Sequence, residues 1–163
     1  MHEAESYAHL WKLVKEIRFA MLTTVDSTGR LSSRPMTTVQ KEFTGELWFF
    51  TSLQSTPAVD IASNAAVGVQ YCDPGKDVYI SISGDAHIER DRVKMESLWS
   101  PMVKAWFPKG IDDPDLGLLC VDAHEAEYWD VKESKVVQLF KIAKAIASGK
   151  RPDDLGEHRK MAL

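Results

Sequence analysis

Short strand-like segments follow one another along this chain with only tight turns between them. Residues 19–25 form the first segment, and the turn residues Asp26-Ser27-Thr28-Gly29 that close it favour a hairpin. A parallel, doubly wound sheet would need a long helix between most strands, and the sequence does not contain such helices. The pattern therefore predicts an antiparallel sheet closed into a small barrel. The later strands are predicted at residues 31–40, 47–52, 66–71, 78–89 and 118–129.

Helical periodicity appears in four further segments, all of them short. In the first, apolar residues recur every three or four positions. The second opens with Ser55-Thr56-Pro57, which supplies a hydroxyl cap and a first-turn proline, and the fourth is followed by Gly149. The predicted helices span residues 7–17, 55–63, 91–99 and 136–147.

The length of 163 residues suits a single domain, and no repeat or linker divides the chain. We assign residues 1–148 to the barrel domain and residues 149–163 to a polar C-terminal tail that is either mobile or docked on a partner.

Composition excludes several classes of protein. Lys plus Arg total 20 against 24 for Asp plus Glu, so the basic excess of a nucleic-acid binder is missing. No apolar run is long enough to cross a bilayer, so we expect neither nucleic acid nor membrane as a partner. Cys72 and Cys120 belong to no Cys-x-x-Cys pair, which argues against a disulfide scaffold or a zinc site. Reduced cysteines and a start without a secretory signal lead us to expect a cytoplasmic protein.

The common catalytic motifs are absent from the sequence. It contains no glycine-rich phosphate loop and no Gly-x-Ser-x-Gly elbow. The five histidines lack metal-ligand spacing, and His87 is best interpreted as a half-exposed strand residue. We therefore assign no metal ligand and no catalytic residue.

Two neighbouring segments carry the positive signal. Arg34 lies among serines and threonines in the second strand, and Pro35 beside it marks an edge or a bulge. If this strand pairs with residues 47–52, Arg34 lies near the helix that begins at Ser55. Free N–H groups at a helix start and a bidentate arginine both suit a phosphate. An exposed edge arginine beside an ordinary capped helix explains the same residues equally well.

Tryptophan is more frequent than a core of this size requires, with 5 in the chain. Trp99, Met102, Val103 and Trp106 have helical spacing that would place them on one stripe, which favours core or subunit interface over a ligand wall. Trp129, at the end of the last strand, fits either role.

Several stretches resemble the pyridoxamine 5′-phosphate oxidase-like FMN-binding split barrels, and within them the general stress protein branch. The resemblance runs from about Tyr7 to the tail. Its motifs are Phe19-Ala20-Met21-Leu22-Thr23-Thr24, Arg34-Pro35-Met36, Leu47-Trp48-Phe49-Phe50-Thr51-Ser52, Trp99-Ser100-Pro101, Ala105-Trp106-Phe107-Pro108 and Glu127-Tyr128-Trp129.

This resemblance implies a mainly β (α+β) fold, a six-stranded antiparallel split barrel with flanking helices. It also implies a homodimer that binds FMN at the subunit interface, so that residues 1–148 form an FMN-binding domain. The cofactor-binding residues that it implies are Arg34, Pro35, Met36, Thr37, Phe50, Thr51, Ser52, Ser55, Thr56, Trp106 and Trp129.

The sequence departs from the family pattern at two places. Thr56-Pro57-Ala58 follows Ser55 where many relatives have a basic residue, so a phosphate would depend on Arg34, hydroxyls and backbone N–H groups. After Trp129 the chain lacks the arginine–histidine signature of true pyridoxamine phosphate oxidases, so we do not expect that activity.

The leading hypothesis is a general stress type flavoprotein, a flavin-dependent oxidoreductase of unassigned substrate. Two alternatives stay open. One is a non-catalytic flavin-binding or stress-sensing module, and the other is the same barrel with haem or deazaflavin. His87 is the nearest axial ligand for a haem.

Overall fold

The computed structural model describes residues 2–131, 135–152 and 156–163, and its elements follow the predicted order closely. The helices are α1 (His2–Val14), α2 (Thr56–Ser63), α3 (Arg92–Leu98), α4 (Pro101–Trp106) and α5 (Lys135–Ser148). The strands are β1 (Ala20–Val25), β2 (Leu31–Met36), β3 (Glu46–Ser52), β4 (Ala66–Asp73), β5 (Val78–Glu89), β6 (Leu116–Asp130) and β7 (Glu157–Ala162). None of the helices in these ranges is both long and apolar enough to span a membrane.

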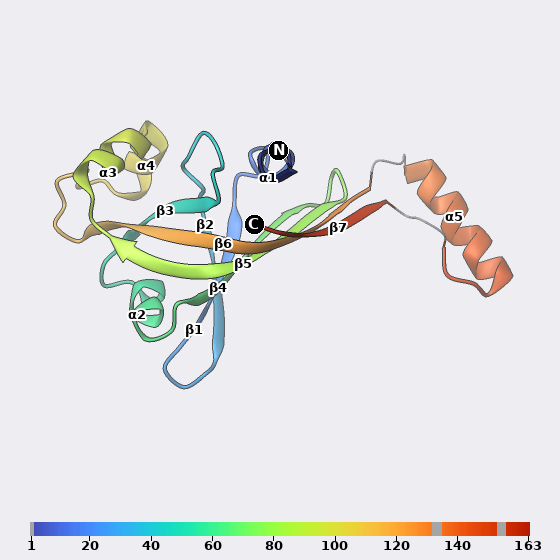
Figure 1. The fold of residues 1–163 in the computed structure, drawn as a ribbon, viewed down its shortest axis with the longest axis horizontal. Coiled ribbons are helices and arrows are strands. Elements are labelled where there is room, and N and C mark those ends of the chain that lie inside the picture. Colours follow the sequence, from blue (N-terminus) through green and yellow to red (C-terminus); the bar gives the residue numbers. More distant parts are fainter. Residues whose placement is uncertain (1, 132–134, 153–155) are drawn as a thin grey trace.

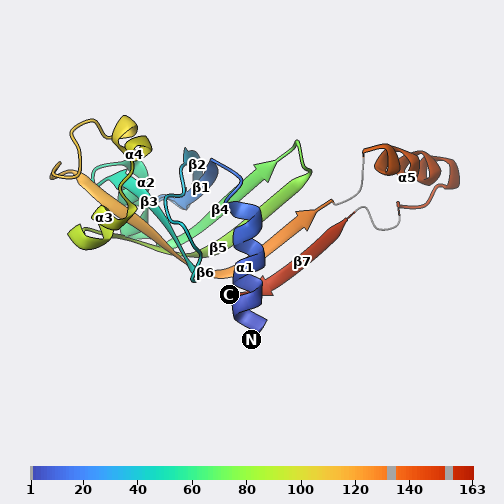
Figure 2. The same cartoon turned by 90° about the horizontal axis from the view of Figure 1, so that it is seen from above.

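All the strands join one antiparallel sheet in the order β2-β1-β4-β5-β6-β3, with β7 also paired to β6 (Figures 1 and 2). The 15-residue β6 organises it, because its first half pairs with β3 and its second half with β7, while β5 runs along its other edge. The predicted class, a mainly antiparallel split barrel with flanking helices, is confirmed.

The closure into a small barrel that the strand pattern predicted is wrong: the sheet is open, because β2 and β3 stand at its two ends and do not pair. β2 ends at Met36, where its partner strand begins at Ala20, and residues 37–40 continue as irregular chain. This chain runs past β3, where the Val39 N–H donates to the Trp48 carbonyl at 3.2 Å and the Gln40 side chain accepts from the Trp48 N–H at 2.8 Å. Pro35 therefore lies on an edge strand, as predicted, since an edge is where a missing N–H is tolerated.

The seventh strand was not predicted, because β7 lies in the segment expected to be a polar tail. Its first four residues, Glu157-His158-Arg159-Lys160, are all polar, so the apolar alternation that identifies a strand is missing there. Cross-strand polar pairs support it instead: His158 Nε2 lies 2.6 Å from Glu127 and Lys160 Nζ lies 2.9 Å from Glu125. Residues 153–155 of the predicted tail lie outside the described residues.

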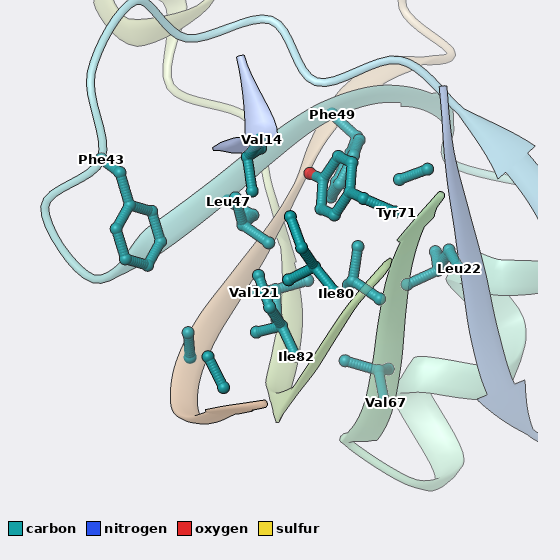
Figure 3. Close-up of a cluster of buried hydrophobic side chains, with 14 of the residues drawn as sticks. Val14, Leu22, Phe43, Leu47, Phe49, Val67, Tyr71, Ile80, Ile82 and Val121 are labelled. Atoms are coloured by element: carbon teal, nitrogen blue, oxygen red, sulfur yellow. The ribbon is translucent and has the colours of Figure 1, made fainter. Parts of the chain in front are cut away.

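The main core lies on one face of the sheet. Leu47 and Phe49 of β3 point into it together with Tyr71, Ile80 and other side chains from the central strands, as Figure 3 shows. Leu10 and Val14 bring one face of α1 onto this cluster.

A second, smaller core lies on the other face of β3 and β6. Trp48 and Phe50 alternate with the residues that enter the main core, so they point to this opposite face. Met95 of α3 and Val103 of α4 cover them there. Both faces of β3 are therefore buried, which accounts for its run of consecutive apolar residues.

Helices α3 and α4 are separate, so the single stripe predicted from Trp99 to Trp106 does not form. Trp99 caps the end of α3, and Ser100 begins a new helix by accepting the Val103 N–H at 3.3 Å. Pro101, in the first turn, suits a helix start and not a continuation of α3.

Candidate functional site

A pocket of about 260 Å³ opens between the end of β2 and helix α4. One wall is the irregular chain after β2, and the opposite wall is α4. Phe50 of β3 forms part of the floor, held by edge-on packing against Trp99 at a ring-centre distance of 5.5 Å. The lining residues are Phe19, Pro35, Met36, Thr37, Thr38, Val39, Phe50, Ser100, Met102, Val103, Trp106 and Phe107.

Apolar side chains dominate the lining, and the rim is open to solvent. Trp106 is 63% exposed, and Phe19 and Met102 are each 45% exposed. Large apolar groups with this much exposed surface around a concavity mark a site for a flat apolar ligand or a partner surface.

Hydroxyl groups supply most of the polar character of the pocket. The Thr38 hydroxyl lies 2.5 Å from the Tyr71 hydroxyl. Burial raises the pKa of Tyr71 well above its ordinary value, so this phenol stays protonated and available as a donor. The Thr38 side chain is thereby fixed at the edge of the pocket.

Arg34 does not line this pocket, because its guanidinium turns toward α2. Nη1 donates to the Thr24 hydroxyl at 2.7 Å, and Nη2 donates to the Ser32 hydroxyl and lies 3.8 Å from Asp60 Oδ2. The buried Asp60 carboxylate also accepts from Thr24 at 2.6 Å. Partial burial lowers the pKa of Arg34, and the charge of Asp60 opposes that shift.

The start of α2 gathers a second group of hydroxyls. Ser55 is the N-cap and accepts the Ala58 N–H at 3.4 Å, and its hydroxyl lies 2.9 Å from that of Thr51. Ser52 donates to the Asp115 carboxylate at 2.5 Å, and Thr56 is exposed in the first turn. The cap predicted from Ser55-Thr56-Pro57 is therefore present.

A match to a known protein family identifies the family to which this chain belongs. The family described as pyridoxamine 5′-phosphate oxidase like matches residues 5–153, most of the chain. The chain belongs to this family.

Individual relatives agree with this membership. Protein bli-3 of Neurospora crassa is 30% identical over 143 residues, which cover 82% of this chain and 68% of that protein. A solved structure of a general stress FMN/FAD binding protein from Xanthomonas citri matches at 32% identity with a TM-score of 0.70, over 80% of this chain and 92% of its own. A structure from Jannaschia sp. CCS1 matches at 27% identity with a TM-score of 0.74, over 98% and 99% of the two chains.

Five of the eleven predicted site residues lie together in the pocket between β2 and α4. Thr51, Ser52, Ser55 and Thr56 gather instead at the start of α2, and Arg34 is held by Thr24 and Asp60. The five that line the pocket are Pro35, Met36, Thr37, Phe50 and Trp106.

Trp129 is not part of this pocket. It lies near the end of β6, at the end of the sheet toward α5 (Figure 2), and stacks on His158 of β7 with ring centres 4.9 Å apart. Residues 132–134, which follow it where the oxidase signature would stand, lie outside the described residues. A role for Trp129 in cofactor binding stays a prediction.

Several pocket residues were not predicted from the sequence. Phe19 and Phe107 lie within stretches that carried the family resemblance, and Ser100 precedes a proline as an N-cap does. These signals were present, but the turn between α3 and α4 decides which side chains face the pocket. His87, the candidate haem ligand, does not line it and lies instead beside Glu89 and Asp122.

Proposed function

We propose that this protein is a cytoplasmic, homodimeric FMN-binding oxidoreductase of the general stress type. The pocket between β2 and α4 carries the proposal, since its aromatic and aliphatic walls suit the flat ring system of a flavin. The Xanthomonas citri relative, described as FMN/FAD binding, supports the choice of cofactor.

The ring and the phosphate of FMN would be bound by two different groups of residues. The ring fits the pocket, with Phe50 and Trp106 as its aromatic walls and Thr37 and Thr38 at its polar edge. Ser52 lies two residues beyond Phe50 on the same face of β3, about 7 Å along the strand. This direction leads toward the cap of α2, where Ser55 and the free N–H groups would hold the phosphate.

Charge at the phosphate end is limited in the protomer. The first turn of α2, Thr56-Pro57-Ala58, carries no basic side chain, and Arg34 already faces Asp60. The proposal therefore places most of the phosphate binding on hydroxyls and backbone N–H groups, with Arg34 as a partly neutralised contributor.

A second copy of the chain would complete the site. The pocket volume of about 260 Å³ lies below the range of about 300–1,000 Å³ that encloses most small ligands. Phe19, Met102 and Trp106 leave apolar surface exposed beside it. Helix α5 also exposes an apolar face, where Phe140 is 71% and Ile146 is 78% exposed. Subunit association would cover such surfaces.

The flavin supplies the redox chemistry when bound, which is consistent with the lack of an acid–base pair in the pocket. The chain's own residues orient the ring, exclude water from one face and keep Tyr71 and Thr38 hydrogen-bonded at the edge. The non-catalytic module shares all these features, so the activity needs a direct test.

The experiment begins with the absorption spectrum of the protein as purified and after addition of FMN. Two flavin bands and about one FMN per chain support the proposal, whereas a Soret band supports haem. Anaerobic addition of NADH or NADPH followed by an electron acceptor then separates the two flavin hypotheses. Repeated turnover supports an oxidoreductase, and bound FMN without turnover supports the module.

A further inference from the structure

Away from the pocket, the second face of the sheet carries a cluster of metal-ligating side chain types. Glu46 comes from β3, Cys120 and Asp122 from β6, and His87 from β5. Cys120 lies opposite His87 in the β5–β6 ladder, and Asp122 lies opposite Glu46 in the β3–β6 ladder. Directly opposed residues share a face, so the register places these four residues on the same face of the sheet.

The distances within the cluster are close to those of a metal site. One ligand atom from each of Glu46, Cys120 and Asp122 lies within 4.8 Å of the other two. His87 Nδ1 lies 3.6 Å from Asp122 Oδ2, a separation that two ligands of one tetrahedral ion have. His87 therefore lies beside the three-residue group, next to Asp122.

The Cys120 thiol provides an independent indication of a ligand. Its residue is 0% exposed, its sulfur faces the two carboxylates, and it forms no disulfide. Within the described ranges no hydrogen bond reaches this sulfur. The thiol belongs to the smaller hydrophobic core, yet its sulfur lies within 4.8 Å of a carboxylate oxygen of both Glu46 and Asp122, a placement that suits a cation shared by the three groups.

A neighbouring lysine is directed elsewhere. The amine of Lys94 lies over the Trp48 ring, 4.4 Å from its centre, and among the described residues it forms no ion pair with Glu46 or Asp122.

His87 also has the outer partner that a metal-bound imidazole usually has. Its Nε2 lies 3.2 Å from Glu89 Oε2, while Nδ1 faces Asp122. A carboxylate on the far nitrogen fixes the tautomer and orients the ring toward an ion.

We propose that Glu46, His87, Cys120 and Asp122 form a binding site for a divalent transition-metal ion of the zinc class. A thiolate and an imidazole with two carboxylates suit Zn²⁺, whereas Ca²⁺ and Mg²⁺ require oxygen ligands alone. Binding forms a metal–sulfur bond and releases the thiol proton to solvent. None of the four residues lines the pocket, so the site is separate from the proposed flavin site.

Binding is tested on the full chain with its cofactor content unchanged. Calorimetric titration with Zn²⁺ is expected to give one site per chain, and Co²⁺ is expected to give a thiolate charge-transfer band in a difference spectrum. His87→Gln and Asp122→Asn, two side chains that are about half exposed, are expected to weaken binding by at least about 10–100-fold. Cys120→Ser is expected to remove the thiolate band.

The chain supplies a matched control in His158 and Glu127, a histidine–carboxylate pair 2.6 Å apart on the β6–β7 ladder with no cysteine beside it. His158→Gln is expected to leave Zn²⁺ binding unchanged. The proposal is overturned if Zn²⁺ does not bind, if His87→Gln and Asp122→Asn bind as tightly as the natural chain, or if His158→Gln is equally affected. Equal affinity for Ca²⁺ would also overturn it, because that result identifies an ordinary acidic surface.

Discussion

The Arg34 guanidinium lies 3.8 Å from the Asp60 carboxylate and shares the Thr24 hydroxyl with it. The arginine predicted to bind a phosphate is therefore already an ion-pair partner within the single chain. Its two possible roles, in stability and in cofactor binding, can be separated by substitution on each side of the pair.

Arg34→Ala leaves the buried Asp60 without its cation. We expect a loss of about 1–3 kcal/mol in the free energy of unfolding, together with weaker retention of FMN. Denaturant unfolding and FMN titration measure the two effects. Unchanged FMN affinity in a folded variant would remove Arg34 from the phosphate site.

Asp60→Asn is the complementary change. It keeps a side chain that can accept from Thr24 at the same place but removes the negative charge that faces Arg34. If Arg34 contributes to phosphate binding, its freed charge should tighten FMN binding severalfold in a titration. Weaker binding would indicate that Asp60 positions the arginine for the cofactor.

Trp106 and Phe50 line the same pocket but differ in burial, so their substitutions should have different effects. Trp106→Ala removes a side chain that is 63% exposed and is expected to lower FMN affinity with little change in stability. Phe50→Ala removes a buried ring and is expected to cost about 3–5 kcal/mol. Thermal unfolding and FMN titration on both variants test this contrast. A Trp106→Ala protein that binds FMN normally would contradict it.

Because of the Tyr71 hydroxyl, we expect the free energy of unfolding to decrease at alkaline pH. Its pKa is raised in the folded protein by burial, so the unfolded chain loses the phenol proton first. The contribution of Tyr71 to the free energy of unfolding should therefore stay constant below about pH 10 and decrease as the pH rises above that value. Tyr71→Phe should reduce the slope. Some slope remains, since burial and Glu157 also raise the pKa of Tyr128. An unchanged slope in Tyr71→Phe would contradict this account.

Gly84 marks the irregularity where β5 passes β6. A Cβ at this position would lie 2.0 Å from the backbone oxygen of Asp122, which cannot move without shifting β6. We expect Gly84→Ala to destabilise the fold by about 1–3 kcal/mol. Gly75→Ala, in a turn where the nearest atom belongs to the Asp73 side chain, is the control and should cost less. If Gly84→Ala and Gly75→Ala lose the same stability in thermal unfolding, the close approach of Gly84 to the β6 backbone does not limit the fold.

The fold was largely predictable because its elements carry local signals. Alternation and turn residues identified six strands, and the caps at Ser55 and Gly149 identified helix boundaries. β7 was missed because its charged residues depend on partners in β6, which no local pattern shows.

The site was predictable only in part, because side-chain direction depends on packing across the sheet. Phe50 and Trp106 line the same pocket because α4 begins as a separate helix with Ser100 as its N-cap. The Arg34 side chain points away from the pocket because it pairs with the buried Asp60 carboxylate. The cluster around Cys120 has no motif, since its members come from three strands and the register places them on the same face of the sheet.

The absorption spectrum of the purified protein, before and after addition of FMN and removal of the excess, tests the central claim most directly. We expect two flavin bands and about one FMN per chain, with the bands diminished in Trp106→Ala. A colourless protein that retains no added FMN would contradict it.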